Sequence, residues 1–287
     1  MAKKVSSIKP YLKWAGGKRQ LLPEISKYFP NNIDTYYEPF IGAGAVLFYK
    51  QPPKAVINDY NTQLITTYKV IKDNVEELIT LLNHHKDQNT KEYFYDIREQ
   101  DRNLDNFNNL SDIEKAARFI YLNKTCYNGL YRVNSQGLFN VPFGKYKNPA
   151  ICEEANLRLI HEYFNHSNIS ILNGDFKDAV QTAKEGDFVY FDPPYHSPNN
   201  MNFTGYQAGG FNEDEQRRLY DTFVELTNKN VHCLLSNSDT EFIRELYKHF
   251  TIHTVKATRA INSDASKRGK ITEVLVDNYS SLHDESL

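Results

Sequence analysis

The 287-residue sequence has few of the features that mark secreted, zinc-binding or membrane proteins. Its three cysteines, Cys126, Cys152 and Cys233, are widely spaced and odd in number, which argues against a disulfide framework and a zinc site. No apolar run approaches the roughly 20 residues needed to cross a bilayer. The basic start, MAKKVSSIKPYLKW, lacks the apolar stretch of a secretory signal. We therefore expect a cytoplasmic protein with reduced thiols and no membrane contact.

Aromatic residues and local charge asymmetry are what the sequence does contain. With 17 Phe, 20 Tyr and a hydrophobic fraction of 40%, the chain can bury a large core and is not disordered. The net charge is only −2, but segments 1–23 and 115–147 are basic and contain no acid, and 256–270 contains Asp264 alone. Basic segments are usually solvated faces, yet beside Tyr- and Asn-rich loops they make a nucleic acid an equally good interpretation.

Short β-branched or aromatic runs alternate with longer helical patterns, which predicts an α/β fold with a mostly parallel, helix-covered sheet. The expected strands are 35–40, 55–59, 169–173, 187–192, 231–237, 251–259 and 271–279, and the expected helices between them include 212–230 and 240–250. The last two strands leave no room for a crossover helix, so we expect an antiparallel pair at or near the sheet edge. This arrangement is typical of the methyltransferase architecture.

The region from about 60 to 154 breaks the alternation because its patterns are nearly all helical. A capping box from Ser111 to Glu114 starts one of its helices. The stretch NGLYRVNSQGLFNVPFGKY, residues 128–146, then predicts a β-hairpin. Its turn-forming residues are Gly129, Asn134, Gln136 and Gly137. We expect an inserted helical domain that carries one basic hairpin.

The stretch DFVYFDPPYHSP, residues 187–198, ends a hydrophobic strand abruptly. Pro193 and Pro194 cannot donate to a strand ladder and forbid its continuation. What remains at the strand end is the Asp192 carboxylate, backbone carbonyls and the Tyr195 ring, a set that can hold a flat amine. The alternative is a strand that simply ends in a proline-rich turn.

Two glycines and an acid follow the first two expected strands. Gly42 and Gly44 in EPFIGAG permit a tight turn and the close approach of a ligand. Asp59 in INDYN lies where α/β nucleotide sites keep an acid for ribose hydroxyls. The pair indicates an adenosine-containing cofactor, although Gly42 and Gly44 can also form a plain strand-to-helix turn. Leu47 stands where a dinucleotide site has Gly or Ala, which weakens an NAD interpretation.

Two further stretches are candidates for the same ligand. LKWAGGKRQLL, residues 12–22, places the only Trp of the chain, Trp14, and Lys18 around a glycine pair. Asp175, in NGDF, ends another strand and can accept a hydrogen bond from an adenine amine. Its alternative role, as a helix N-cap, is at least as well supported.

Seven motifs together identify a family that the chain resembles. They are KWAGGK, EPFIGAG, INDYN, NGLYRVNSQGLFNVPFGKYKNP, GDF, FDPPY and LSNSD. From about residue 9 to 279, these motifs and their order resemble the Dam-type DNA adenine methyltransferases, the GATC-type enzymes of the alpha group of N(6)-adenine methyltransferases. No catalytic position departs from the family pattern. The resemblance implies a catalytic methyltransferase domain formed by 1–62 and 155–287 and a DNA target-recognition domain formed by 63–154.

The resemblance also implies a cofactor and partners. The methyl donor is S-adenosylmethionine, no metal is expected, and the substrate is adenine in double-stranded DNA, within GATC or a longer site that starts with GAT. It leaves open whether a separate cognate restriction endonuclease, as in a restriction-modification system, accompanies the chain. We expect a monomer or weak dimer.

The resemblance assigns the site residues in three groups. The catalytic segment is Asp192, Pro193, Pro194 and Tyr195. The cofactor residues are Trp14, Lys18, Glu38, Phe40, Gly42, Gly44, Asp59, Asp175, Phe176 and Asp192. The DNA residues are Lys13, Tyr127, Asn128, Arg132, Asn134, Pro142 and Lys145, among which Lys13 and Arg132 fall at guanine-reading positions, and Tyr127 and Asn128 at positions that invade the base stack.

These roles suggest a mechanism. An adenine amine is a poor nucleophile because its lone pair is delocalised into the ring. The Asp192 carboxylate and the Pro193 carbonyl can each accept one amine hydrogen, which directs the lone pair at the methyl group for direct displacement. The base is unreachable inside the duplex and must be flipped out, and Tyr195 offers a ring for stacking. The loop 196–210 is expected to close over the site.

Three competing interpretations remain open. An amino methyltransferase can act on another planar nitrogen, such as a cytosine amine or an RNA or protein amide. A nucleic-acid-binding module that uses a nucleotide only for structure does not need Asp192, whereas an enzyme does. A nicotinamide oxidoreductase is the third, and tight S-adenosylmethionine binding without affinity for NAD excludes it.

Overall fold

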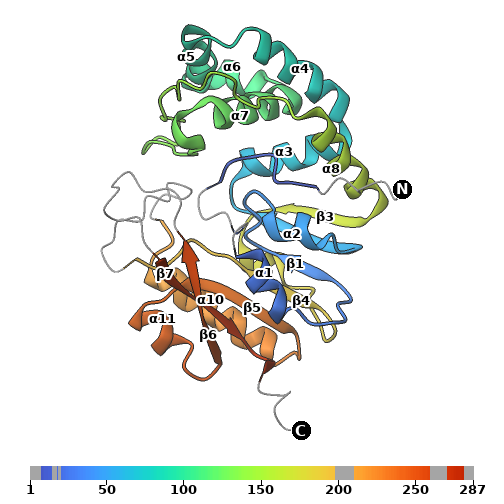
Figure 1. The fold of residues 1–287 in the computed structure, drawn as a ribbon, viewed down its shortest axis with the longest axis vertical. Coiled ribbons are helices and arrows are strands. Elements are labelled where there is room, and N and C mark those ends of the chain that lie inside the picture. Colours follow the sequence, from blue (N-terminus) through green and yellow to red (C-terminus); the bar gives the residue numbers. More distant parts are fainter. Residues whose placement is uncertain (1–7, 15–17, 19–20, 198–209, 259–269, 281–287) are drawn as a thin grey trace. The chain divides into compact units, whose positions relative to one another are not determined.

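The computed structural model describes residues 8–14, 18, 21–197, 210–258 and 270–280 (Figure 1). The chain forms two compact units. The helical unit comprises Met1–Gly17, Gly42–Pro53 and Asp59–Gly174, and the sheet unit comprises Lys18–Ile41, Lys54–Asn58 and Asp175–Leu287. The expected insertion, 63–154, lies wholly within the helical unit. Gly16, Gly17, most of the loop 196–210 and most of the basic segment 256–270 lie outside the described residues.

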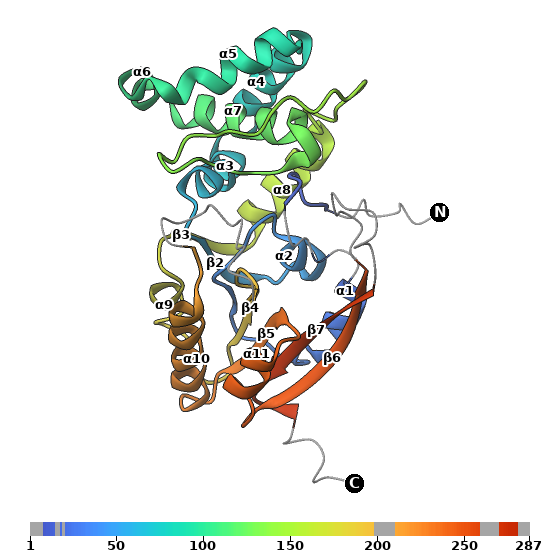
Figure 2. The same cartoon turned by 90° about the vertical axis from the view of Figure 1, so that its left-hand side faces the viewer.

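The expected sheet is present, and all seven expected strands are confirmed. In chain order they are β1 (Tyr36–Glu38), β2 (Lys54–Asp59), β3 (Asn168–Asn173), β4 (Phe188–Phe191), β5 (His232–Ser238), β6 (Thr251–Thr258) and β7 (Lys270–Asp277). The strand order is β3-β2-β1-β4-β5-β7-β6. Strand β1 pairs in parallel with β2 and β4, and β4 pairs in parallel with β5. Strand β7 is antiparallel to β6, as expected, and it is also antiparallel to β5 (Figure 2).

Alternate residues of the central strands pack against different helices of the sheet unit. These helices are α1 (Leu22–Ile25), η1 (Ser26–Tyr28), α9 (Phe176–Ala179), α10 (Glu213–Thr227) and α11 (Glu241–Leu246). Val189 and Phe191 join a buried cluster with residues of α9, α10 and α11. Phe188 instead contacts Phe29, which follows η1, with 4.8 Å between ring centroids. Because β4 is buried on both faces, its sequence is a continuous apolar run rather than an alternating one.

The helical unit is organised around one buried helix. Its elements are α2 (Ala45–Lys50), α3 (Thr62–Asp73), α4 (Val75–Asp87), α5 (Lys91–Glu99), η2 (Gln100–Arg102), α6 (Leu104–Asn109), α7 (Asp112–Thr125), η3 (Tyr127–Gly129), α8 (Glu154–His166) and β3. Helix α7 packs against α3, α4 and α5 (Figure 1). The expected capping box begins α7, because the Glu114 N–H donates to Ser111 Oγ and the Ser111 N–H donates to Glu114 Oε2.

The expected β-hairpin is present only as a minimal one. In the hairpin segment, defined as residues 126–144, two isolated antiparallel bridges join Cys126 to Phe143 and Val133 to Phe139. The chain reverses where the Asn134 N–H donates to the Leu138 carbonyl. Its backbone also bonds to groups outside the hairpin, which is one reason why no continuous ladder forms: Phe139 binds side chains of η2 and Gly144 donates to the Thr125 carbonyl.

Candidate active site

The end of β4 carries a compact charged cluster in the sheet unit, formed by Lys18, Asp192, Tyr195 and Glu273. Lys18 Nζ lies 3.0 Å from Asp192 Oδ1 and 3.9 Å from Glu273 Oε2. The same Nζ lies 4.2 Å from the centroid of the Tyr195 ring, and the Tyr195 hydroxyl donates to Glu273 Oε2 at 2.8 Å. The Lys18 side chain is only 5% exposed. With Tyr195 neutral, two carboxylates and one ammonium give the cluster a net charge of about −1.

Burial controls the ionisation of this cluster. It raises the pKa of Asp192 to about 6, against the opposing effect of Lys18 and with a further increase from Glu273. Burial, assisted by the charges of Asp192 and Glu273, also raises the pKa of Tyr195 well above its usual range. Tyr195 therefore stays a neutral hydroxyl donor to Glu273, and this bond fixes the orientation of its ring.

Two buried amides hold the backbone that the prolines remove from the sheet. Gln216 in α10 donates its Nε2 to the Pro194 carbonyl at 2.9 Å, and Asn237 in β5 accepts the His196 N–H at 3.0 Å. Asn237 Nδ2 donates to Gln216 Oε1, and both side chains are fully buried. Buried backbone groups need such partners where no strand can supply them. The segment from Asp192 to His196 is thus restrained on both sides of Tyr195.

Sequence reasoning missed Glu273 and Gln216, and it quoted Asn237 only within LSNSD. Gln216 lies three residues before the fully buried Leu219 on α10, so a polar residue on an apolar helix face was the available signal. Glu273 had no comparable signal, because only the antiparallel pairing of β7 with β5 places it opposite Ser238.

Three other candidates of the sheet unit are two aromatic residues, Phe40 and Phe176, and a partly buried acid, Asp175. The rings of Phe40 and Phe176 are stacked with 5.2 Å between centroids, and Phe211 meets Phe40 edge-on at 5.7 Å. Asp175 is the N-cap of α9, accepting the Lys177 N–H at 2.9 Å. Asp175 also receives both Nη groups of Arg218, at 2.9 and 2.7 Å. The N-cap alternative for Asp175 is therefore what the structure contains, and any adenine contact must share this carboxylate with Arg218.

Glu38 ends strand β1 and is only 2% exposed. Its Oε2 accepts the Tyr36 hydroxyl at 2.7 Å. The charges of Asp192, Glu38 and Glu273 all act, after burial, to raise the pKa of Tyr190. Glu38 thus contributes negative potential to the end of β4.

In the helical unit, Trp14, Gly42, Gly44 and Asp59 lie together. Asp59 Oδ2 accepts the Gly42 N–H at 3.1 Å and Oδ1 accepts the Asn61 N–H at 2.9 Å. The Tyr60 N–H is a third backbone donor to this carboxylate, which has about four acceptor sites and so can still accept from a ribose hydroxyl. Gly42 has φ +48°, and a Cβ added there would lie 2.9 Å from Trp14 Cδ1. Gly44 has φ +71°, and its Cβ would lie 2.8 Å from the Tyr68 hydroxyl. Only glycine fits both positions.

Lys13 lies against the exposed turn η3. Buried Asn123 holds them together, because it accepts the Lys13 N–H at 2.9 Å and donates to the carbonyls of Lys13 and Gly129. The Lys13 Nζ lies 4.1 Å from the centroid of the Tyr146 ring. At the turn, Tyr127 is 51% exposed and Asn128 has a left-handed φ of 57°. The structure therefore presents the exposed Tyr127 ring on the same turn whose Gly129 lies against the Lys13 side chain.

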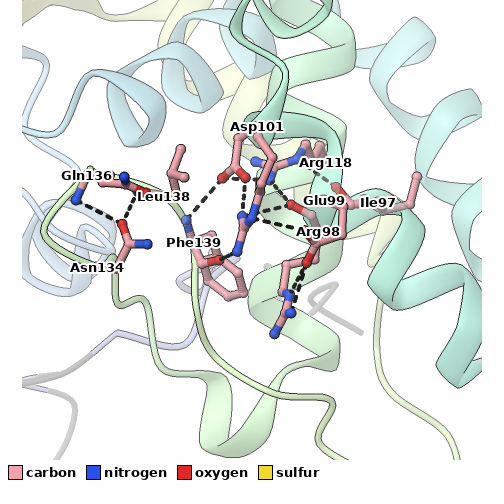
Figure 3. A network of polar contacts seen from close by, with 10 residues as sticks. Ile97, Arg98, Glu99, Asp101, Arg118, Asn134, Gln136, Leu138 and Phe139 are labelled. Atoms are coloured by element: carbon pink, nitrogen blue, oxygen red, sulfur yellow. Dashed lines mark hydrogen bonds and ion pairs between the residues drawn. The ribbon is translucent and has the colours of Figure 1, made fainter.

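The other DNA candidates lie along the hairpin segment and just after it. Arg132 is exposed and donates its Nε to Asn140 Oδ1 at 2.8 Å. Asn134 forms the turn itself, accepting the Gln136 and Leu138 N–H groups at 3.0 Å each (Figure 3). Exposed Pro142 accepts the Tyr127 N–H at 2.8 Å, and exposed Lys145 has φ 52°. Asn134 thus has a clear structural role, whatever else it contacts.

The strand topology and the Asp-Pro-Pro-Tyr segment at the end of β4 define a methyltransferase of the S-adenosylmethionine-dependent class. The D12 class N6 adenine-specific DNA methyltransferase family model matches residues 14–261, and the chain belongs to this family. It is therefore an adenine-specific DNA methyltransferase, for which the family implies S-adenosylmethionine as methyl donor.

Curated relatives cover nearly the whole chain. The type II methyltransferase M1.LlaDCHI of Lactococcus lactis subsp. cremoris is 48% identical, over 95% of this chain and 96% of that protein. The type II methyltransferase M.MjaIII of Methanocaldococcus jannaschii is 43% identical, over 95% and 99%. The DNA adenine methylase of Escherichia coli (strain K12) is 34% identical, over 92% and 93%.

The described residues contain neither a helix that could span a membrane nor a group of side chains that could hold a metal ion. None of the helices there combines the length and apolar composition needed to span a membrane. No group of three or more His, Cys, Asp or Glu side chains in that part of the chain is arranged to hold a metal ion.

Proposed function

We propose that this chain methylates the exocyclic amine of adenine within GATC, or within a longer site that starts with GAT, in double-stranded DNA. The observation that carries the chemistry is the cluster at the end of β4, where Asp192 and the Tyr195 ring lie around the Lys18 ammonium. The specificity rests on the resemblance of Lys13 and Arg132 to guanine-reading positions. Relatives named type II methyltransferases support a role in a restriction-modification system.

In the proposed reaction, the strand end seats a flipped adenine. Asp192 and the Pro193 carbonyl each accept one amine hydrogen, so that the nitrogen lone pair turns out of the ring plane. Tyr195 stacks on the base, and its bond to Glu273 fixes the ring beforehand. The negative charge of the cluster stabilises the positive charge that develops on the nitrogen. Lys18 keeps Asp192 ionised and oriented by binding Oδ1, which leaves Oδ2 for the amine.

S-adenosylmethionine supplies an electrophilic methyl group on a sulfonium, and the residues present suit such a ligand. The acids of the strand end favour a cation, and Asp59 is oriented by two backbone N–H groups to accept from a ribose. Trp14, Gly42 and Gly44 are proposed as the floor of the cofactor site. Phe40, Phe176 and Asp175 are proposed to contact the adenine moiety, with Glu38 and Lys18 completing the set.

Residues 63–154 are proposed as the DNA target-recognition domain. Lys13 and Arg132 are proposed to read guanines. Pro142 is proposed to contact the DNA beside them, and Lys145 is proposed to contact the DNA backbone. Tyr127 and Asn128 are proposed to enter the base stack while the target adenine is flipped. Their exposure at a tight turn supports this role, because a side chain that enters a duplex must project from the surface.

The decisive experiment incubates the protein with a labelled methyl donor and with duplexes that contain GATC or one of its single-base variants. The expected result is label on N6 of the adenine in GATC and little label on the variants. Label on cytosine would contradict the proposed base, and equal label on all sites would contradict the proposed specificity. The absence of label from every duplex would contradict DNA as the substrate.

A further inference from the structure

The hairpin segment has one outward edge whose backbone groups are bound by side chains instead of a strand. Across the Val133–Phe139 bridge, the Asn134 N–H donates to Leu138 and the Asn140 N–H donates to Arg132. In this register Phe139 belongs to the non-hydrogen-bonded pair, so its own N–H and carbonyl point away from the first arm. Without partners for these groups, the pairing register of the two hairpin arms would be weakly specified.

Two consecutive residues of η2 take up both groups of Phe139. Asp101 Oδ2 accepts the Phe139 N–H at 3.0 Å (Figure 3). Arg102 Nη2 donates to the Phe139 carbonyl at 2.6 Å. One acceptor and one donor thus face a single residue, as a neighbouring strand would present them. We call Asp101, Arg102 and Arg118 the hairpin clamp.

Within the clamp, Arg118 of α7 fixes the orientation of Asp101. Its guanidinium lies 2.9 Å from Asp101 Oδ2 and donates to the carbonyls of Ile97 and Arg98 at 2.9 and 2.8 Å (Figure 3). Arg118 and Asp101 are only 2% and 3% exposed. A buried ion pair contributes little net stability but imposes a geometry when its polar groups are satisfied. The clamp is therefore better suited to position the hairpin than to stabilise the fold.

A chain of direct contacts leads from the clamp to Arg132. Asn140 follows Phe139, and its Oδ1 accepts from Arg132 Nε at 2.8 Å while its N–H donates to the Arg132 carbonyl. Arg132 is exposed, and the bond from its Nε to Asn140 restrains the direction of the guanidinium plane. A bidentate contact to guanine O6 and N7 needs such an oriented guanidinium.

We propose that Asp101 and Arg102, oriented by Arg118, are positioning residues for target-sequence recognition. They set the register of the hairpin segment and, through Asn140, the direction of the Arg132 guanidinium. This inference rests on the proposed function, in which Arg132 reads a guanine. It adds residues that contact no base yet control discrimination.

Arg102→Ala tests the clamp most cleanly. The Arg102 side chain is 28% exposed, and its removal leaves Asp101 paired with Arg118, so no buried charge loses its partner. Discrimination is the ratio of kcat/KM on GATC to kcat/KM on the site changed at the guanine that Arg132 reads. This ratio is expected to fall by roughly 5- to 10-fold, the lower part of the range for one base contact. Amide hydrogen exchange at Phe139 and Asn140 is expected to accelerate. Affinity for S-adenosylmethionine is expected to stay unchanged.

The matched control is Arg158→Ala, which removes another arginine of the helical unit. Arg158 binds Glu76 at 2.7 and 2.9 Å on α4 and makes no contact with the hairpin segment. It is expected to leave both discrimination and exchange at Phe139 unchanged. Arg102→Lys, which keeps a donor for the Phe139 carbonyl, is expected to restore part of the discrimination.

A double-variant comparison separates positioning from direct contact. In an Arg132→Ala background, Arg102→Ala is expected to reduce discrimination no further, because the two residues act through the same base contact. An equal loss in both backgrounds would overturn the inference. So would a uniform loss of affinity on all duplexes with a salt slope lower by about 1, which marks a phosphate contact. If Arg132→Ala itself discriminates normally, the proposed role of Arg132 fails. Unchanged amide exchange at Phe139 and Asn140 in Arg102→Ala would separately overturn the claim that the clamp positions the hairpin segment.

Discussion

Buried Lys18 and the partly buried Asp192 form an ion pair, 3.0 Å from Nζ to Oδ1, at the point where two prolines end strand β4. A carboxylate in such a place is costly to ionise, which is why burial raises the pKa of Asp192 to about 6. Lys18 offsets part of that cost and occupies only one of the two oxygens. The pair thus keeps a charged acceptor at the end of β4, and its removal has predictable consequences.

Asp192→Ala is expected to lower the rate of methyl transfer by ~100-fold or more, because it removes an acceptor that aligns the amine. Folding and duplex affinity are expected to survive. Single-turnover kinetics measure the rate, and thermal melting and a duplex-binding titration provide the controls. Asp192→Asn, which keeps the shape and loses the charge, is expected to be similarly slow. Near-normal turnover in either variant would contradict the mechanism.

The rate of methyl transfer is expected to depend on pH through Asp192. Only the ionised carboxylate accepts both the Lys18 and amine hydrogens, so the single-turnover rate should rise with pH through about 6 and then level off. Lys18 lowers this pKa, Glu273 raises it, and the neighbouring Tyr190 and Tyr195 stay neutral. Glu273→Gln removes a like charge and keeps an acceptor for Tyr195. It is therefore expected to shift the acidic limb to lower pH.

Glu225→Gln is the matched control for this shift. Glu225 is an exposed acid of the sheet unit that binds Lys177 at 2.8 Å, so its loss changes the net charge equally but at another place. Its pH profile is expected to match that of the parent protein. A Glu273→Gln profile that moved to higher pH, or did not move, would show that Asp192 does not control the limb.

Asp59→Ala is expected to weaken cofactor binding by roughly 1.5 to 3 kcal/mol, the range for a hydrogen bond to a charged group. Calorimetry with S-adenosylmethionine measures the loss. Because Asp59 also accepts the Gly42 and Asn61 N–H groups, thermal melting must show that the variant is folded. Unchanged affinity in a folded variant would make Asp59 a purely structural cap of the loop.

The strands and the strand-end motif were predictable because local chemistry determines them. Pro193 and Pro194 end a strand in the sheet interior because neither can donate to its ladder, and the capping box at Ser111 needs only residues within one helical turn. Glu273 was not predictable, since the pairing register of β7 brings it to Lys18 and Tyr195. The hairpin was predicted, but not that its arms would be joined by only two isolated bridges. Its pattern could not reveal that Phe139 bonds to η2, because that contact spans 38 positions of sequence.

Substitutions of Arg132 test the proposed sequence specificity. Arg132→Ala is expected to lower discrimination at one guanine by about 1 to 3 kcal/mol, because a bidentate contact to O6 and N7 is lost. Lys147→Ala removes another exposed cation of the same basic segment. If Lys147 touches only phosphate, this change is expected to weaken binding to every duplex alike. Relative rates on GATC and its single-base variants measure both effects.

The comparison of these two variants decides how Arg132 acts. A phosphate contact depends on charge alone, so its loss lowers affinity without changing the order of preferred sites and reduces the salt dependence of binding. A base contact depends on the direction of the guanidinium, which Asn140 fixes at 2.8 Å from Nε. Arg132→Lys keeps the charge and loses the fork, and it is therefore expected to retain affinity and lose discrimination. Unchanged relative rates in Arg132→Lys and Arg132→Ala would assign Arg132 to the DNA backbone.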